Sequence, residues 1–308
     1  MRQQQPHLNK EHAPISPALA LPWVLEWHRG EPMAGDQIRQ GMNIFRQSKI
    51  IFERHAGEET VQVIQRGEKL ELRFGNHIVQ SAMSIRQPDH LLLEYTQAMM
   101  TGFAIHPDPV RTLQIGLGAG AITRFIHRHF PGCTQDIVEI SPVVIEAATR
   151  HFKLPASDRL NIIESDGHAF LKSIKRQYDL IFQDAFEAEG VAGHLQTREY
   201  FLDLRRVLAP GGVLVNNAWG SNQTNLRHVA AHMSAVFGQL YSISVGVGTN
   251  VIFFAQAQRR ALPLRDILRS GEEISARIPF DLTRWVRQLQ KVNQPENGPL
   301  AGPLARTI

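Results

Sequence analysis

Hydrophobic and polar positions follow two different patterns along the chain, and the first lies between residues 48 and 80. Four short runs in this region mix β-branched and polar residues: KIIFER, TVQVIQR, KLELRFG and HIVQS. Gly57, Gly67 and Gly75 separate these runs, and glycine is typical of tight turns between strands. The pattern predicts a small antiparallel sheet of hairpins, and the Leu- and Met-rich stretch after it predicts a helix over residues 90–101.

The second pattern begins near residue 110, where short apolar runs alternate with longer amphipathic stretches. The apolar runs predict buried strands, and the stretches between them predict helices. The expected strands cover residues 113–115, 135–140, 160–164, 178–183 and 213–216, and the expected helices cover 121–129, 142–151, 168–173, 197–208 and 225–237. Two further apolar runs, at 241–245 and 251–256, predict a hairpin. The fold class is therefore α/β, with a doubly wound, Rossmann-like sheet that ends in a late β-hairpin and follows a small antiparallel β-hairpin domain.

Local signals and shifts in composition set the expected boundaries. Ser141 and Pro142 are typical of an N-cap and a first helical position, and the sequence Ala-Pro-Gly-Gly at 209–212 is expected to end the helix before it. We expect a flexible N-terminal tail over residues 1–40, a β-hairpin domain plus linking helix over 41–108, and the Rossmann-like domain over 109–258. The C-terminal extension, 259–308, has one expected helix at 282–292 and ends in a Pro- and Gly-rich stretch, so we expect it to be partly disordered.

Composition narrows the class of protein. The 308 residues carry a net charge of +4 without a dense Lys/Arg run, so we expect no nucleic acid partner. The single cysteine, Cys133, excludes an internal disulfide and a four-cysteine zinc site. No apolar window approaches the roughly 20 residues of a membrane span, so we expect no membrane partner and a cytoplasmic location. His228 and His232 have helical metal-ligand spacing but no third ligand in view, which favours a solvated helix face and no metal.

Three glycines follow the first expected strand of the second half, in the sequence VRTLQIGLGAG. Gly116, Gly118 and Gly120 let the backbone approach a ligand closely, and the helix that follows offers free amide groups. Glu139 lies near the end of the next strand, at the spacing of a carboxylate that binds ribose hydroxyls. These features predict a nucleotide-type site. The alternative is that the glycines serve only close packing of strand and helix.

Further acidic residues occur where the following strands end. Asp166 comes after the strand at 160–164, Asp184 follows the strand at 178–183, and Glu187 lies in the same loop. Because ligands of open α/β sheets bind at the carboxyl ends of the strands, these side chains are candidates for one site. Asp166, with the backbone of Gly167 beside it, is suited to an adenine amino group, and Asp184 to the reacting end of the ligand. Each acid alone is also compatible with a helix cap or a turn.

The sequence from about residue 57 to 257 resembles the spermidine synthase (polyamine aminopropyltransferase) family. The stretches that carry the resemblance are HIVQS, LQIGLGAG, IVEISPVVIEAA, ESDGHAFL, YDLIFQDAFEAEG and LQTREYFLDLRRVLAPGGVLVNN. The glycine turn and LAPGGVLV are shared with many methyltransferases, whereas the preceding hairpins and the acidic loop after residue 183 are more specific. The resemblance implies a class I methyltransferase-type sheet in a homodimeric transferase.

The resemblance also implies roles for individual residues. Asp184 matches the catalytic aspartate that helps to deprotonate an attacking amine, and Glu187 stands where a second acid grips the polyamine. Tyr95, Gln97 and Gln80 are implied to line the amine site. The implied ligands of the nucleoside co-substrate are Gly116, Gly118, Gly120, Glu139, Ile140, Asp166 and Gly167.

The implied reaction moves an aminopropyl group from decarboxylated S-adenosylmethionine to a small amine such as putrescine, without a tightly bound cofactor. Three places depart from the family. Thr96 and Gln97 replace a His-Glu pair, Ala119 replaces an aspartate that pairs with the donor's ammonium, and the loop after residue 183 lacks the usual proline after its second acid. Ala119 favours an alternative, an S-adenosylmethionine-dependent methyltransferase, because an aspartate there would repel the donor's carboxylate. A second alternative is a degenerate nucleoside-binding protein without enzymatic activity.

Overall fold

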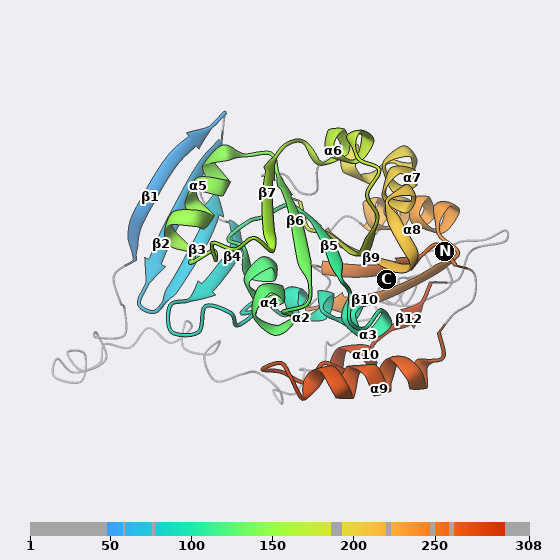
Figure 1. Cartoon of the computed structure of the whole chain (residues 1–308). Helices are drawn as coiled ribbons and strands as arrows, with labels where there is room; N and C mark the ends of the chain where they lie inside the picture. Colours follow the sequence, from blue (N-terminus) through green and yellow to red (C-terminus); the bar gives the residue numbers. More distant parts are fainter. Residues whose placement is uncertain are drawn as a thin grey trace, which may run out of the picture. The chain divides into compact units, whose positions relative to one another are not determined.

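The computed structural model of the chain describes residues 48–57, 59–75, 78–185, 193–219, 223–246, 250–258 and 262–292 (Figure 1). These residues form a four-stranded and an eight-stranded sheet with helices packed against them, and all belong to the unit Gln47–Ile308. The expected tail over residues 1–40 and the end of the chain from residue 293 lie outside the described residues.

The four-stranded sheet comes first in the chain. Its strands are β1 (Lys49–Ala56), β2 (Glu59–Arg66), β3 (Lys69–Phe74) and β4 (Ile78–Ser84). They are antiparallel and lie in sequence order, so the predicted hairpins are confirmed. Gly67 turns the chain between β2 and β3 with a φ of 59°, in the left-handed region that glycine adopts without strain. Alternate residues of β2 and β3 form an apolar face that packs against helix α5 (Pro142–His151).

Two short helices follow, where the sequence predicts a single helix over residues 90–101. They are α2 (Glu94–Met99) and α3 (Thr101–Ile105), separated at Met100. The chain is still extended at Leu93, and the carbonyl of the buried Leu91 accepts a hydrogen bond of 2.8 Å from the Gln97 side chain. The helix begins later than its apolar pattern predicts, because Leu91 is already buried in the segment that precedes the helix.

The eight-stranded sheet has the order β12-β10-β11-β9-β8-β5-β6-β7. Its strands are β5 (Arg111–Ile115), β6 (Thr134–Glu139), β7 (Leu160–Glu164), β8 (Tyr178–Gln183), β9 (Leu208–Trp219), β10 (Gln239–Val245), β11 (Asn250–Gln256) and β12 (Gln290–Lys291). β5 to β9 run parallel, and β10 and β11 form the predicted late hairpin. The strand order reverses beside β5, so the sheet is doubly wound, as predicted. Ligands of such sheets bind at this reversal, outside the carboxyl ends of the strands.

Helices cover both faces of this sheet (Figure 1). One face packs against α2, α3 and α4, and the other against α6, α7 and α8. Four of these helices are α4 (Ala121–His129), α6 (Gly167–Ser173), α7 (Arg198–Arg206) and α8 (Gln223–Val236), and the 3₁₀ helix η2 (Gly193–Gln196) precedes α7. Ser141 caps α5 by accepting from the Val144 amide, with Pro142 in the first turn, which confirms the predicted start of this helix.

β9 is longer than the strand predicted at 213–216, and α7 ends at Arg206 rather than at 208. Residues 209–212, expected to end the preceding helix, belong to β9. Gly211 has a φ of +80°, and a Cβ on Gly212 would lie 2.9 Å from the carbonyl oxygen of Asp179. These glycines therefore allow an irregular pairing with β8, where the register shifts between Tyr178 and Leu180.

The C-terminal region differs most from the prediction. The helix expected over residues 282–292 is wrong in extent: α10 covers only Thr283–Val286, and β12 then pairs with β10 at the sheet edge. A longer helix, α9 (Leu264–Ser275), has no counterpart among the predicted elements. Its internal Gly271 weakens a helical signal, but it also lets α9 lie close to Ala104 of α3 and Val286 of α10.

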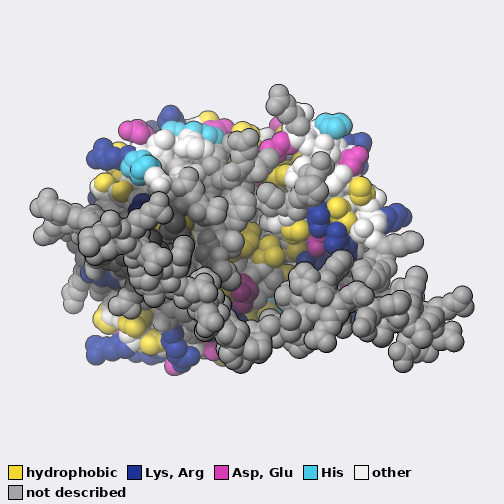
Figure 2. Space-filling model, turned by 180° about the vertical axis from the view of Figure 1, so that it is seen from behind, with side chains coloured by type: hydrophobic (Ala, Val, Ile, Leu, Met, Phe, Trp, Pro, Cys, Tyr) yellow, Lys and Arg dark blue, Asp and Glu magenta, His cyan; other side chains and the backbone are white. Residues whose placement is uncertain are grey.

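The surface of the described residues has a mixed charge. Figure 2 shows Lys and Arg side chains at several separate places on one face, with acidic and histidine side chains elsewhere on it. Within the described ranges, no helix is both long and apolar enough to cross a membrane.

Candidate functional site

The glycine turn connects β5 to α4 at the point where the strand order reverses. Gly116, Gly118 and Gly120 have φ values of 90°, 52° and 69°. A Cβ on Gly116 would lie 2.4 Å from the carbonyl oxygen of Asp184, and one on Gly120 would lie 2.7 Å from a leucine side chain. The alternative interpretation, close packing, therefore explains these two glycines. A Cβ on Gly118 would meet nothing closer than Ser81, at 3.6 Å, so Gly118 requires only its left-handed backbone.

Glu139 lies at the end of β6, next to this turn. Its side chain is buried, and its oxygens accept hydrogen bonds from the backbone amides of Leu117 at 2.9 Å and Ser141 at 3.0 Å. Burial raises the pKa of Glu139, and the surrounding amides, which favour the charged form, oppose this shift. The carboxylate thus holds the glycine turn and presents oxygen lone pairs at the edge of the sheet.

Asp166 caps the helix that follows β7. Its Oδ1 accepts a hydrogen bond of 2.8 Å from the Ala169 amide, and its Oδ2 lies 3.1 Å from His194 Nε2. Burial opposes ionisation, but the Ala169 amide and His194 outweigh it, and the pKa of Asp166 lies below its ordinary value. Asp166 is therefore an ionised hydrogen-bond acceptor, and it also caps a helix, which is the alternative role that its position in the sequence allows.

Asp184 follows β8 and has side-chain partners. Its Oδ1 accepts from Asn217 Nδ2 at 2.8 Å, and its Oδ2 accepts from the Tyr95 hydroxyl at 3.3 Å. Burial raises the pKa of Asp184 to about 6, although both donors favour the charged form. Burial and the Asp184 charge raise the pKa of Tyr95 well above its ordinary value, so this hydroxyl keeps its proton and donates.

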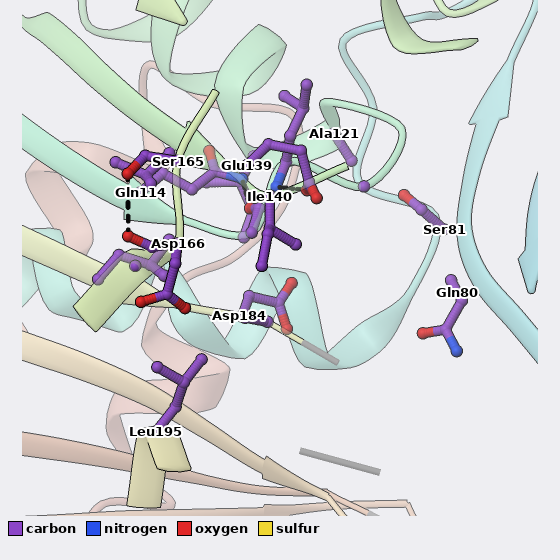
Figure 3. Close-up of a pocket in the computed structure, with 18 of the residues that line it drawn as sticks. Gln80, Ser81, Gln114, Ala121, Glu139, Ile140, Ser165, Asp166, Asp184 and Leu195 are labelled. Carbon is purple, nitrogen blue, oxygen red and sulfur yellow. Dashed lines mark hydrogen bonds between the residues drawn. The ribbon is translucent and has the colours of Figure 1, made fainter. Parts of the chain in front are cut away.

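These residues line one cavity at the carboxyl ends of the strands, where ligands of such sheets bind. Figure 3 shows Asp166 and Asp184 between Ile140 and Leu195 in this view, with Gln80 and Ser81 entering from the four-stranded sheet. The predicted site residues that line the cavity are Gln80, Tyr95, Gly116, Gly118, Glu139, Ile140, Asp166, Gly167 and Asp184. Residues from both sheets therefore build the site.

Two predicted site residues within the described ranges do not line this cavity. Gln97 is the clearest correction, because its side-chain amide donates to the Leu91 carbonyl while Thr96 takes a place in the wall. Gly120 supports the turn from outside the lining. Glu187 lies outside the described residues.

The cavity wall also contains polar residues that the sequence analysis did not single out. Ser81 follows Gln80, His194 lies on η2, and Gln114 donates to the Gly116 carbonyl at 2.7 Å. The sequence could have indicated Gln114 as a site residue, because it is a polar residue within the apolar run of β5. No sequence pattern indicates Asn217, because its contact with Asp184 depends on the pairing of β9 with β8.

No group of three or more His, Cys, Asp and Glu side chains that could hold a metal occurs within the described ranges. Of the two histidines with metal-ligand spacing, His232 uses its Nδ1 toward the Gln196 carbonyl, 2.9 Å away.

A doubly wound sheet with a glycine turn and successive carboxylates at its reversal point is typical of enzymes that bind a nucleotide-type ligand. Comparison with known sequences identifies the family within this class. The family described as "Spermine/spermidine synthase domain" matches residues 94–253. The chain is 31% identical over 242 residues to the polyamine aminopropyltransferase of Chromobacterium violaceum, covering 78% of this chain and 93% of that protein.

Solved structures agree on the fold. A spermidine synthase in complex with the transition state analogue AdoDATO matches with a TM-score of 0.64 at 18% identity, over 78% of this chain and 84% of that one. Human methyltransferase-like protein 13 in complex with SAH matches with a TM-score of 0.56 at 24% identity, over 67% of this chain and 97% of that one. The chain belongs to the spermine/spermidine synthase family and is a transferase.

Proposed function

We propose that this protein is an aminopropyltransferase, which moves an aminopropyl group from decarboxylated S-adenosylmethionine to a small amine such as putrescine. The observation that carries the proposal is Asp184, a cavity carboxylate with a pKa of about 6 that is hydrogen-bonded to the Tyr95 hydroxyl. A carboxylate in this state is ionised at neutral pH and can accept the proton that an ammonium group must lose before its nitrogen attacks.

In the proposed reaction, the amine nitrogen attacks the methylene carbon bonded to the sulfonium sulfur. A C–N bond forms, the C–S bond breaks, and its electron pair leaves with methylthioadenosine. An alkylamine has a pKa of about 10 and is mostly protonated at neutral pH, so it must lose a proton before it attacks. Asp184 accepts that proton, while Tyr95 and Asn217 hold the carboxylate in place. Proximity of the two bound substrates supplies much of the remaining rate enhancement.

The nucleoside part of the donor is assigned to the other carboxylates. Glu139 accepts hydrogen bonds from the ribose hydroxyls, and Asp166 accepts one from the adenine amino group. Ile140 supports this assignment because it is apolar, lines the cavity and is 63% exposed, so a purine ring would cover it. The donor is then a co-substrate that binds and leaves in each cycle.

The amine end is assigned to Gln80 and Tyr95, which lie on the side of the cavity formed by β4 and α2. Glu187 remains a prediction for the distal ammonium of the acceptor. The family resemblance also leads us to expect a homodimer, which sedimentation velocity of the purified chain tests.

A second candidate is an S-adenosylmethionine-dependent methyltransferase on the same fold. The match to a methyltransferase solved with SAH supports it. Its other support, the replacement of an acid by Ala119, is weakened by geometry. The Ala119 side chain is fully buried in the apolar cluster with Met83, Val144 and Phe152, and it does not face the cavity.

The two candidates differ in the product that leaves. The enzyme is incubated with putrescine and either decarboxylated or intact S-adenosylmethionine, and the nucleoside product is identified by mass spectrometry. Methylthioadenosine from the decarboxylated donor is the expected result. S-adenosylhomocysteine from the intact donor, with no methylthioadenosine, would replace the proposal by the second candidate.

A further inference from the structure

Two asparagines form a chain of hydrogen bonds that ends on Asp184. Asn250 Nδ2 donates to Asn217 Oδ1 at 3.0 Å, and Asn217 Nδ2 donates to Asp184 Oδ1 at 2.8 Å. Asn217 lies on β9 and Asn250 begins β11, and these strands pair with each other. The proposed reaction as described above assigns no step to Asn250.

The direction of this chain follows from hydrogen-bonding chemistry. An ionised carboxylate only accepts, so the Asn217 atom that faces Asp184 must be the nitrogen. The oxygen of the same amide then faces Asn250, which must supply a donor. The carboxylate and a donating Asn250 therefore favour the same orientation of the Asn217 amide, with its nitrogen toward Asp184. Asn217 is 1% exposed, so water has little access to replace either bond.

We propose that Asn217 and Asn250 are positioning residues that keep Asp184 oriented and ionised for proton transfer. This inference rests on the proposed function of Asp184 as the base. Asn217 holds Oδ1 and Tyr95 contacts Oδ2, so the carboxylate cannot rotate freely, and its remaining lone pairs are available to the amine. Without the Asn217 donor, the buried carboxylate loses one of the two bonds that favour its charged form.

The other titratable groups around Asp184 come from several elements. Tyr95 of α2 bonds to it directly, and Glu139 after the glycine turn, Asp166 before α6 and His194 of η2 line the same cavity. None of these groups contacts Asn217 or Asn250 through a hydrogen bond in the described part of the chain. A change at either asparagine therefore acts on Asp184 through the amide chain rather than through another acid or base.

The experiment uses Asn217→Leu, Asn250→Leu and the double variant, with Asn216→Leu as the matched control. Asn216 is the neighbouring residue on β9, is 4% exposed and faces the opposite side of the sheet. Two quantities are measured: the apparent pKa of the acid limb of kcat/KM for the amine, and the pKa of Asp184 from the carboxyl ¹³C signal that Asp184→Asn removes. The second quantity requires no turnover, so it separates failure of this inference from failure of the proposed function.

Asn217→Leu is expected to raise both pKa values by about one to two pH units, the effect of losing a hydrogen bond to a charged group. Asn250→Leu should raise them by about half a unit, since the Asn217 amide then loses its orienting partner. In the Asn217→Leu background, Asn250→Leu should add nothing, because it acts through Asn217. Asn216→Leu should leave both values unchanged.

Unchanged pKa values in a folded Asn217→Leu protein would overturn the inference, and so would equal shifts in the Asn216→Leu control. Additive shifts in the double variant would exclude action through Asn217. If Asn217→Leu fails to fold, Asn250→Leu decides alone, because its side chain is only half-buried; an unshifted Asp184 pKa in that variant contradicts the proposal.

Discussion

Asp166 and Asp184 follow successive strands of one sheet and line one cavity, yet their surroundings differ. Asp166 is half-buried, is bonded to a backbone amide and to His194, and has a pKa below its ordinary value. Asp184 is bonded to two side chains, and burial raises its pKa to about 6. The same residue type is thus an ionised acceptor in one environment and a group able to exchange a proton near neutral pH in the other. The comparison favours nucleoside binding at Asp166 and chemistry at Asp184.

The largest effect is expected for Asp184→Asn. The amide keeps the size of the side chain but cannot accept the amine's proton, so turnover should fall about 100-fold or more. Methylthioadenosine affinity, measured by calorimetry, should stay close to wild type. The variant should also melt no lower than wild type at neutral pH, because it avoids burying a charge. Full turnover, or an unfolded variant, would remove Asp184 as the base.

The second prediction concerns Glu139 at the nucleoside end. Glu139→Ala removes a charged acceptor of ribose hydroxyls, a contact worth roughly 1.5–3 kcal/mol. Titration calorimetry should therefore show methylthioadenosine binding weakened by about ten- to a hundredfold. Because Glu139 also holds the glycine turn, Glu139→Gln is the control for lost packing. Unaltered affinity in the alanine variant would take the ribose away from this residue.

The third prediction is a pH dependence that distinguishes the two aspartates. The folded-state pKa of Asp184 is raised to about 6, above the ordinary value of 3.8, so folding disfavours its charged form. The free energy of unfolding of wild type and of Asp184→Asn is measured by denaturant unfolding across the pH range. The variant should be more stable than wild type above about pH 6, and this difference should shrink as the pH falls toward 3.8. The rate, kcat/KM for the amine, should decline below about pH 6 as Asp184 takes up a proton.

The ionised Asp166 side chain stabilises the folded protein, whereas that of Asp184 destabilises it, because folding lowers the pKa of Asp166. Its contribution to stability is present above the unfolded-state value of 3.8 and is lost as the pH falls through the folded-state value. Thermal melts of Asp166→Asn across the acid range measure this loss. If the difference in unfolding free energy between Asp184→Asn and wild type does not change with pH, burial of the Asp184 charge does not destabilise the wild-type protein.

The smallest effect is expected for Asp166 itself. Asp166→Asn keeps an N-cap oxygen for the Ala169 amide, so α6 should be retained, and at neutral pH the melting temperature should fall only by the contribution of the lost charge. The adenine amino group would meet a weaker, uncharged acceptor, and methylthioadenosine should bind a few-fold less tightly. Asp166→Ala, which also loses the cap, should cost about 1 kcal/mol of stability in denaturant unfolding. A loss of turnover as large as that of Asp184→Asn would break the comparison.

Much of the fold could be predicted from local pattern. Ser141 and Pro142 place the start of α5, and the apolar run YDLIFQ coincides with β8. These features depend on neighbouring residues alone: a cap satisfies nearby amides, and a run of buried side chains needs only a sheet with two covered faces. Acids at the ends of parallel strands share one edge by topology, which is why the sequence alone predicts one cavity for Glu139, Asp166 and Asp184.

Other features were decided by tertiary contacts. Residues 209–212 carry a helix-ending signal, but Leu208 and Val213 on either side of them pair with β8, and the whole segment belongs to β9. Gly271 weakens a helix that close packing on α3 and α10 stabilises. Gln97 follows Tyr95 in the sequence, yet its amide turns to the Leu91 carbonyl. The sequence by itself determined which carboxylates meet at the sheet edge. Only the tertiary structure decided their charge states and the role of Asn217, because burial and hydrogen-bond donors from distant strands set the pKa of each acid.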